Sequence, residues 1–239
     1  MDPLPPYYQQ IVDNVARVRE RIANAAIAAG RVPETVQLVA VTKYVGSQMA
    51  ATLLAANCPV LGESRPQQLF DKSSDPDLAG ARWHLIGHLQ RNKVRRTLPL
   101  VALIHSIDSL RLLQAVDRVA GELSRKAKVL LEVNCSGDAE KGGLSQPQLL
   151  ELMARLTEFP HVEVRGLMTM AARAGGTTVA TRNFAALHKL REQAITAGPP
   201  GLVLPELSMG MSGDFEVAIR EGATQVRIGS LLFEDVPRQ

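Results

Sequence analysis

The sequence predicts one α/β domain, a single (β/α)8 barrel of the TIM type that spans residues 1–239. Strand-like and helix-like segments alternate along the chain, and eight of them are strand candidates. Parallel strands need crossover connections, so this alternation indicates a parallel sheet covered by helices, and the count of eight favours closure into a barrel. An open doubly wound sheet is the competing architecture, but its nucleotide signatures GxGxxG and GxxxxGK[ST] are missing.

The strand candidates are short apolar runs rich in β-branched residues. The first, "VQLVAVTK" at 36–43, is typical of a strand that is buried on both faces of a sheet. The other strand candidates are 58–64, 82–88, 103–108, 128–135, 162–170, 204–208 and 225–233.

The helix candidates repeat apolar residues at a period near 3.6. The first, 7–29, keeps this spacing until it stops at Gly30. The others are 47–56, 66–72, 90–98, 110–125, 146–158, 178–197 and 214–221. A helical pattern therefore lies between each pair of consecutive strands, as a barrel requires.

The composition excludes several classes of function. The excess of 27 basic over 24 acidic residues gives a net charge of +3, which is too small to indicate a nucleic-acid partner. No apolar run approaches the ~20 residues that cross a bilayer, and residues 1–6 do not resemble a signal peptide, so we expect no membrane association. Cys58 and Cys135 lack CxxC spacing, which indicates free thiols in a reducing compartment, and we expect a cytoplasmic protein.

Lys43 ends the most apolar strand candidate. Strand alternation puts its side chain on the same face as Val39 and Val41, and functional side chains of barrels lie at the carboxyl ends of strands. Partial desolvation there lowers the pKa of a lysine amine and frees it to form a Schiff base. The alternative is a lysine that extends into solvent at a strand end.

Two loops rich in small residues follow the last two strands. "SMGMSG" at 208–213 precedes a short helix whose first backbone N–H groups and dipole favour an anion. Gly229 and Ser230 follow the eighth strand, and barrels usually hold phosphate in the loops after strands seven and eight. The alternative is that the glycines make only tight turns and that Ser212 only caps the helix.

Arg227 lies inside the last strand candidate, between Val226 and Ile228. A guanidinium in an apolar strand is costly unless another group accepts its hydrogen bonds. A structural carboxylate would serve, and so would a ring nitrogen of a bound cofactor.

Motifs spread along the whole chain resemble those of the YggS/PROSC family of pyridoxal 5'-phosphate homeostasis proteins. The most specific are "WHLIGHLQRNK" at 83–93 and "LSMGMSGDFEVAIREGATQVRIG" at 207–229. The others are "LVAVTK" at 38–43, "LGESRPQQL" at 61–69, "IHSIDS" at 104–109, "VLLEVNCSGDAEKGG" at 129–143 and "GLMTM" at 166–170.

The resemblance implies a barrel like the amino-terminal domain of alanine racemase, which is fold type III, without the carboxy-terminal β-domain. It implies pyridoxal 5'-phosphate (PLP) as the cofactor, bound as a Schiff base on Lys43, with Arg227 beside the pyridine nitrogen. The cofactor-binding residues expected from the residues and the resemblance together are Lys43, Ser64, Ser208, Ser212, Gly213, Arg227, Gly229 and Ser230.

Three positions depart from the family pattern. Ser64 replaces the usual asparagine, which puts any contact of that amide near the cofactor in doubt. Val45 stands where many bacterial relatives carry a second lysine, and Glu234 stands where a glycine usually follows Phe233. None of these changes touches Lys43 or Arg227.

Three further features are weaker candidates. His84 and His88 have the spacing HxxxH, but on a strand they are separated by roughly 13 Å, too far for one ion, so we expect no metal site. The basic run 90–96 favours a solvated helix face over an RNA site. Lys141, in a glycine-rich loop after the fifth strand, either reaches the cleft or is a solvated loop lysine.

Three functions are compatible with these residues: a PLP carrier, an amino-acid racemase, and a regulatory partner protein that reports cofactor status. A racemase needs an acid and a base on opposite faces of the α-carbon. In alanine racemases a second domain supplies one of them, a tyrosine, and we expect no such domain in this chain. An arginine at the pyridine nitrogen also weakens the cofactor as an electron sink. We therefore expect a carrier with no catalytic residue, which supplies PLP to apoenzymes and is a monomer or a weak dimer.

Overall fold

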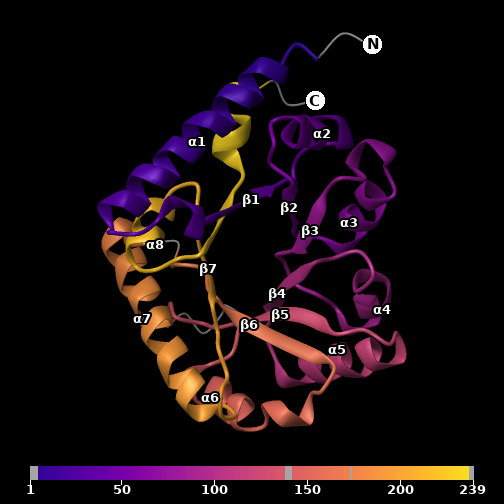
Figure 1. The fold of residues 1–239 in the computed structure, drawn as a ribbon, viewed down its shortest axis with the longest axis vertical. Helices are drawn as coiled ribbons and strands as arrows, with labels where there is room; N and C mark the ends of the chain where they lie inside the picture. The colour runs from indigo at the N-terminus through magenta and orange to yellow at the C-terminus, as the bar shows by residue number, and fades with distance from the viewer. Residues whose placement is uncertain (1–4, 138–141, 173, 237–239) are drawn as a thin grey trace.

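The computed structural model describes residues 5–137, 142–172 and 174–236, and its centre is the closed parallel barrel that the sequence predicts. The eight strands follow one another around the barrel in chain order, and β8 pairs with β1 to close it. Helices connect the strands on the outside (Figure 1). The strands are β1 (Gln37–Val41), β2 (Val60–Glu63), β3 (Arg82–Leu85), β4 (Leu103–Ile107), β5 (Ala127–Glu132), β6 (Val162–Met168), β7 (Glu206–Met211) and β8 (Gln225–Ile228).

The helices confirm the predicted segments, with two divisions: the predicted helix 146–158 consists of α6 (Gln146–Ala154) and the 3-10 turn η4 (Leu156–Glu158). The predicted helix 90–98 is split into a 3-10 turn, η3 (Arg91–Lys93), and the short α4 (Val94–Thr97). The other α-helices are α1 (Tyr8–Ala28), α2 (Ser47–Ala55), α3 (Pro66–Ser73), α5 (Leu110–Glu122), α6 (Gln146–Ala154), α7 (Gly176–Ala197) and α8 (Phe215–Arg220). The remaining 3-10 turns are η1 (Pro33–Thr35), η2 (Pro76–Leu78), η4 (Leu156–Glu158) and η5 (Ser230–Phe233).

The last two strands differ from their predicted ends in opposite directions. β7 continues to Met211, whereas the sequence predicts a loop from residue 208 onward. β8 stops at Ile228, and the apolar residues after it form η5 instead of strand. An apolar run at the edge of a barrel therefore does not distinguish a strand from a 3-10 turn.

Local sequence explains where several helices begin. Ser145 accepts a hydrogen bond from the amide of Gln148, whose side chain accepts one from the amide of Ser145, and this capping box starts α6. Ser109 accepts from the amide of Leu112 at the start of α5. Such caps satisfy backbone N–H groups that have no partner within the helix.

The first helix packs against the end of the chain. In Figure 1, α1 in indigo lies beside the yellow segment that contains η5. The amide of the buried Asn14 side chain donates to the carbonyls of Leu232 (3.3 Å) and Glu234 (2.9 Å). These long-range contacts hold the segment that follows β8, and with it the last loop of the barrel.

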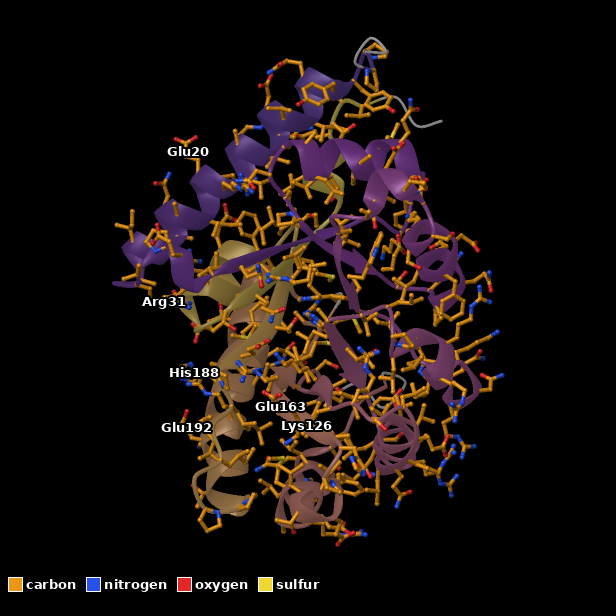
Figure 2. The ribbon with its side chains drawn as sticks, turned by 45° about the vertical axis from the view of Figure 1, so that its right-hand side comes forward. Glu20, Arg31, Lys126, Glu163, His188 and Glu192 are labelled. Carbon is orange, nitrogen blue, oxygen red and sulfur yellow. The ribbon has the colours of Figure 1, made fainter. Side chains whose placement is uncertain are left out.

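The barrel interior carries charged residues at the end where the strands begin, followed by an apolar layer. Where the strands begin, Arg165 pairs with Glu163 (3.0 Å) and Glu206 (3.2 Å), and Figure 2 labels Glu163 and Lys126. A small apolar layer lies above them, made by Leu103, Leu130 and Met168.

In the described ranges, no helix is long and apolar enough to cross a membrane.

Candidate functional site

Arg227 lies in β8 with its guanidinium buried inside the barrel. One nitrogen donates to the hydroxyl of Ser208 (2.6 Å) and another to the carbonyl of Thr169 (2.9 Å). Both acceptors are neutral, and none of the described carboxylates forms an ion pair with Arg227. Burial lowers the pKa of Arg227 to about 10, against the opposite effect of the carboxylates of Glu132 and Asp214. A buried cation held in this way still has N–H donors to offer a ligand.

Ser208 extends this contact across the barrel. Its hydroxyl oxygen lies 2.8 Å from Nδ1 of His105, whose Nε2 lies 3.0 Å from Nδ1 of His84. β5 and β6 separate the strands that carry His105 and Ser208, so the two side chains meet only through the interior of the closed barrel. We call Arg227, Ser208, His105 and His84 the histidine chain.

Arg227 determines the direction of each hydrogen bond in the histidine chain. A guanidinium cannot accept, so the Ser208 oxygen accepts from it, and the described residues offer the Ser208 proton no acceptor other than Nδ1 of His105. His105 must then carry its proton on Nε2, which donates to Nδ1 of His84. The histidine chain therefore consists of two neutral imidazoles, one hydroxyl and one cation.

The electrostatics of the two imidazoles agree with this assignment. Burial, helped by the charge of Arg82, lowers the pKa of His84 to about 3. Burial also lowers the pKa of His105 well below its usual value, and His84 and Arg227 lower it further. Both rings are therefore neutral at physiological pH, and the positive charge stays at the Arg227 end.

Lys43 lies in a turn directly after β1. The strand ends at Val41, because the amide of Val45 donates to the carbonyl of Thr42 (3.1 Å) and closes a β-turn. Lys43 occupies the first central position of this turn. The residue is thus at the carboxyl edge of the barrel, as the sequence predicts, but it is not part of the strand.

The amine of Lys43 lies 4.8 Å from the centre of the Tyr44 ring, which is 85% exposed. Successive side chains of a strand point to opposite faces, but the turn brings the side chains of Lys43 and Tyr44 together. Within the described residues the amine has no hydrogen bond or ion pair. An exposed cation–π contact contributes only about 0.5–1 kcal/mol, so a ligand can displace it.

The loops after β7 and β8 meet at the same edge. The backbone N–H of Gly229 donates to the hydroxyl of Ser212 (3.3 Å), next to Ser230 at the start of η5. No described atom lies within 4 Å of the place that a Gly213 Cβ would occupy, so this part of the loop is open. Ser212 does not cap α8, where Asp214 is the N-cap residue. The structure therefore brings together the four residues predicted to hold phosphate.

Gly210 has a different role from the other glycines of this segment. Its φ is +90°, and a Cβ there would lie 2.6 Å from the Cβ of Ala218 on α8. The position requires glycine for its backbone conformation and for the close approach of the helix. Gly210 thus fits the alternative of a purely structural glycine.

Ser64 and Lys141 complete the predicted set. Ser64 follows β2 at the same edge, and its hydroxyl has no hydrogen-bond partner among the described residues. Its backbone touches that of Gly87, where an added Cβ would lie 2.2 Å from the Ser64 carbonyl oxygen. Lys141 lies outside the described residues.

Sequence reasoning missed two interior residues, His105 and Glu132. Glu132 ends β5, and burial together with the charge of Asp108 raises its pKa, while Arg227 and His88 lower it. His105 lies two residues after Leu103, and Glu132 lies two residues after Leu130, so each shares the interior face with a leucine of its own strand. This alternation is the signal in the sequence that could have identified them.

Comparison with known proteins identifies relatives over nearly the whole chain. A family model described as the alanine racemase N-terminal domain matches residues 10–237. The pyridoxal phosphate homeostasis protein of Aquifex aeolicus is 38% identical over 221 residues, which is 92% of this chain and 96% of that protein.

Solved structures agree. PipY of Synechococcus elongatus, solved with PLP bound, is 34% identical with a TM-score of 0.83, covering 93% of this chain and 99% of that one. An alanine racemase from Corynebacterium glutamicum shares the fold at 14% identity and a TM-score of 0.69, covering 92% of this chain and 63% of that one. The motifs, the barrel and these relatives lead to one assignment. The chain belongs to the YggS/PROSC family of pyridoxal phosphate homeostasis proteins.

Proposed function

We propose that this protein binds PLP as a Schiff base on Lys43 and acts in intracellular PLP homeostasis, supplying the cofactor to apoenzymes without substantial turnover. The observation that carries the proposal is the presence of three kinds of group toward one edge of the barrel. They are the amine of Lys43, which has no hydrogen bond or ion pair among the described residues, the guanidinium of Arg227, and the joined loops at Ser212 and Gly229. The printed names of the relatives and the PLP-bound PipY support the choice of cofactor.

The donor set suits a ligand with an aldehyde, a ring nitrogen and a phosphate. Lys43 offers the amine, Arg227 offers N–H donors to an unprotonated ring nitrogen, and the hydroxyls and amides of the loops at Ser212 and Ser230 suit the phosphate oxygens. The hydroxyl of Ser208 contacts Arg227 and His105, and its contact with the cofactor stays a prediction. Bound PLP would supply an aldehyde for the lysine and, in enzymes, an electron sink.

The limited turnover follows from Arg227. Even with its pKa lowered to about 10, the guanidinium is charged at neutral pH and can only donate. A ring nitrogen that accepts from it stays unprotonated, which weakens the electron sink that racemisation needs.

A racemase is the second candidate, and one observation favours it. Glu132 is a largely buried interior carboxyl group whose pKa is raised, so it is the sort of group that serves as a general acid. The test is to incubate the holoprotein with L- and D-amino acids in deuterium oxide and to follow the α-proton by NMR. We expect no exchange on the scale of enzymatic rates, ~1 per second or faster. Exchange at such rates with accumulation of the opposite enantiomer, both abolished by Glu132→Gln, would establish the racemase instead.

The site assignment is tested by reduction with borohydride and mass spectrometry. Wild-type protein with PLP should show an absorbance band that borohydride bleaches, with the mass adduct on Lys43. Lys43→Ala should lose both signals. Lys126→Ala is the matched control, because this lysine lies at the opposite end of the barrel, where β5 begins (Figure 2), and it should keep both. An adduct on another lysine in wild-type protein would refute the assignment.

A further inference from the structure

Three polar residues contact one another behind the turn that carries Lys43. They are Thr42, Glu63 at the end of β2 and Lys72 on α3, and all three are buried. Gly62, the residue before Glu63, faces the interior, since an added Cβ would lie 3.0 Å from Val39. Strand alternation therefore puts Glu63 on the helix side of the barrel wall. We call Thr42, Glu63 and Lys72 the Thr42 clamp.

The clamp holds the first residue of the turn by all of its polar groups. The amide of Thr42 donates to the carbonyl of Gly62 (3.1 Å), and its hydroxyl donates to Glu63 (2.7 Å). Its carbonyl accepts both from the amide of Val45 (3.1 Å), which closes the turn, and from the ammonium of Lys72 (2.7 Å). Lys72 also forms an ion pair with Glu63. Two side chains from β2 and α3 thus fix the backbone from which Lys43 extends.

Stability alone does not account for this buried ion pair. Desolvation of two charges offsets most of their attraction, and apolar residues of similar volume usually serve a core as well or better. One oxygen of Glu63, Oε2, also has no partner among the described atoms. What apolar residues could not supply is a donor to the Thr42 carbonyl.

We infer that Lys72 and Glu63 are positioning residues, which hold the turn so that the amine of Lys43 meets a ligand anchored by the other loops. The inference rests on the proposed role of Lys43 as the Schiff-base lysine. Lysine is long and flexible, and a fixed Cα restricts the volume its amine explores. Correct placement of reacting groups is a large factor in rate, and a misplacement of about 1 Å can cost about a hundredfold.

The test variant replaces the pair together, as Glu63→Leu with Lys72→Met, because removal of one partner leaves a buried charge and destabilises the fold. Leu69→Val is the matched control: it weakens the packing of the same helix, where Leu69 is fully buried, and leaves the Thr42 clamp intact. Both variants are compared with wild-type protein by circular dichroism before use.

Two measurements separate positioning from a general loss of the site. The first is hydrogen exchange of the Val45 amide in the protein without cofactor, which should become at least about tenfold faster in the double variant. The second compares PLP with pyridoxine 5'-phosphate, which has the same ring and phosphate but no aldehyde. The rate of Schiff-base formation on Lys43 should fall between about tenfold and a hundredfold. The dissociation constant of pyridoxine 5'-phosphate should stay within about twofold of wild type.

Each outcome decides the inference. Unchanged exchange at Val45 would overturn it, whatever the cofactor does. An equal loss of affinity for both ligands would also overturn it, because the clamp would then support the whole site. If wild-type protein forms no Schiff base on Lys43, the proposed function fails. The inference then fails with it, even if hydrogen exchange of the Val45 amide is faster in the double variant. Faster exchange with slower Schiff-base formation in the double variant, but not in Leu69→Val, would support it.

Discussion

The histidine chain and the Thr42 clamp are both buried polar networks, but they lie on opposite sides of the barrel wall. The histidine chain crosses the interior, and its only charge is at Arg227. The Thr42 clamp lies between β2 and α3, contains a cation and an anion, and touches the backbone beside Lys43. In the proposed function, the first network presents a charged group to the ligand, while the second holds the backbone beside the amine of Lys43.

The comparison teaches that burial of polar groups serves two purposes in this barrel. Within the histidine chain, Arg227 contacts only neutral partners, so its charge is not neutralised by a described carboxylate. In the Thr42 clamp the cation and the anion neutralise each other, so the clamp affects its surroundings through the position of the Thr42 backbone. Four predictions test this distinction, from the largest expected effect to the smallest.

Loss of one charge of the Thr42 clamp should lower the free energy of unfolding strongly, and loss of both charges should lower it only weakly. Lys72→Met should lower the free energy of unfolding by about 3–5 kcal/mol, because Glu63 is then a buried charge without its partner. The double variant Glu63→Leu, Lys72→Met should recover most of this loss. Urea unfolding curves measure both, and equal losses in the single and double variants would show that the ion pair itself stabilises the fold.

Removal of the charge at the Arg227 end of the histidine chain should weaken ligand binding. Arg227→Gln should weaken binding of pyridoxine 5'-phosphate by about ten- to a hundredfold, equivalent to about 1.5–3 kcal/mol, because a charged hydrogen bond to the ring is lost. Arg220→Gln, which removes an exposed arginine on α8, should leave the affinity unchanged. Equilibrium titration followed by fluorescence supplies the dissociation constants, and a wild-type value for Arg227→Gln would remove Arg227 from the site.

The neutral imidazoles should make stability depend on pH. The pKa of His84 falls from 6.5 in the unfolded chain to about 3 in the fold, so below pH 6.5 the unfolded state binds a proton that the folded state does not. The stabilisation is fully present above pH 6.5 and is lost as the pH falls, by about 1.4 kcal/mol per pH unit for each such histidine.

His84→Asn keeps an acceptor in the place of Nδ1 and removes the titrating group. Between roughly pH 6.5 and pH 5 this variant should lose about 2 kcal/mol less stability than wild-type protein. The double clamp variant, which retains both histidines, should keep the wild-type slope. Unfolding curves at several pH values give the slopes, and an unaltered slope in His84→Asn would mean that His84 titrates alike in both states.

Loss of the Thr42 hydroxyl should have the smallest effect on stability. Thr42→Val removes one hydrogen bond to Glu63 and should cost about 0.5–1.5 kcal/mol of stability. Because Lys72 still holds the Thr42 carbonyl, hydrogen exchange of the Val45 amide should stay near its wild-type rate. Faster exchange there would show that the side chain of Thr42, and not its carbonyl, restrains the turn.

The sequence predicted the order of the barrel and the residues at its edge better than it predicted their surroundings. Lys43 and Arg227 could be chosen because a charged residue at or inside an apolar strand is a local anomaly. Lys72 could not, because a lysine in the last turn of a short helix is typical of a solvated position. Its burial arises only when α3 packs over the end of β2.

The histidines illustrate the same limit. The spacing of His84 from His88 raises only the possibility of a metal ligand, and His105 has no such spacing to another histidine. The contact between His105 and Ser208 joins residues that are 103 positions apart in the chain. Such a contact depends on closure of the barrel and on the register of the intervening strands, and neither is contained in the pattern of one segment.

The sequence by itself determined the alternation of strands and helices, the small residues of the last two loops, and the presence of an amine and a guanidinium at strand ends. These are consequences of local periodicity and of side-chain chemistry, which each segment carries with it. Tertiary structure alone decided that Lys43 lies in a turn held from behind by Lys72, and that Arg227 is held by a neutral chain across the interior. The reason is that burial and hydrogen bonding between distant strands arise only when the barrel closes and brings their side chains within reach.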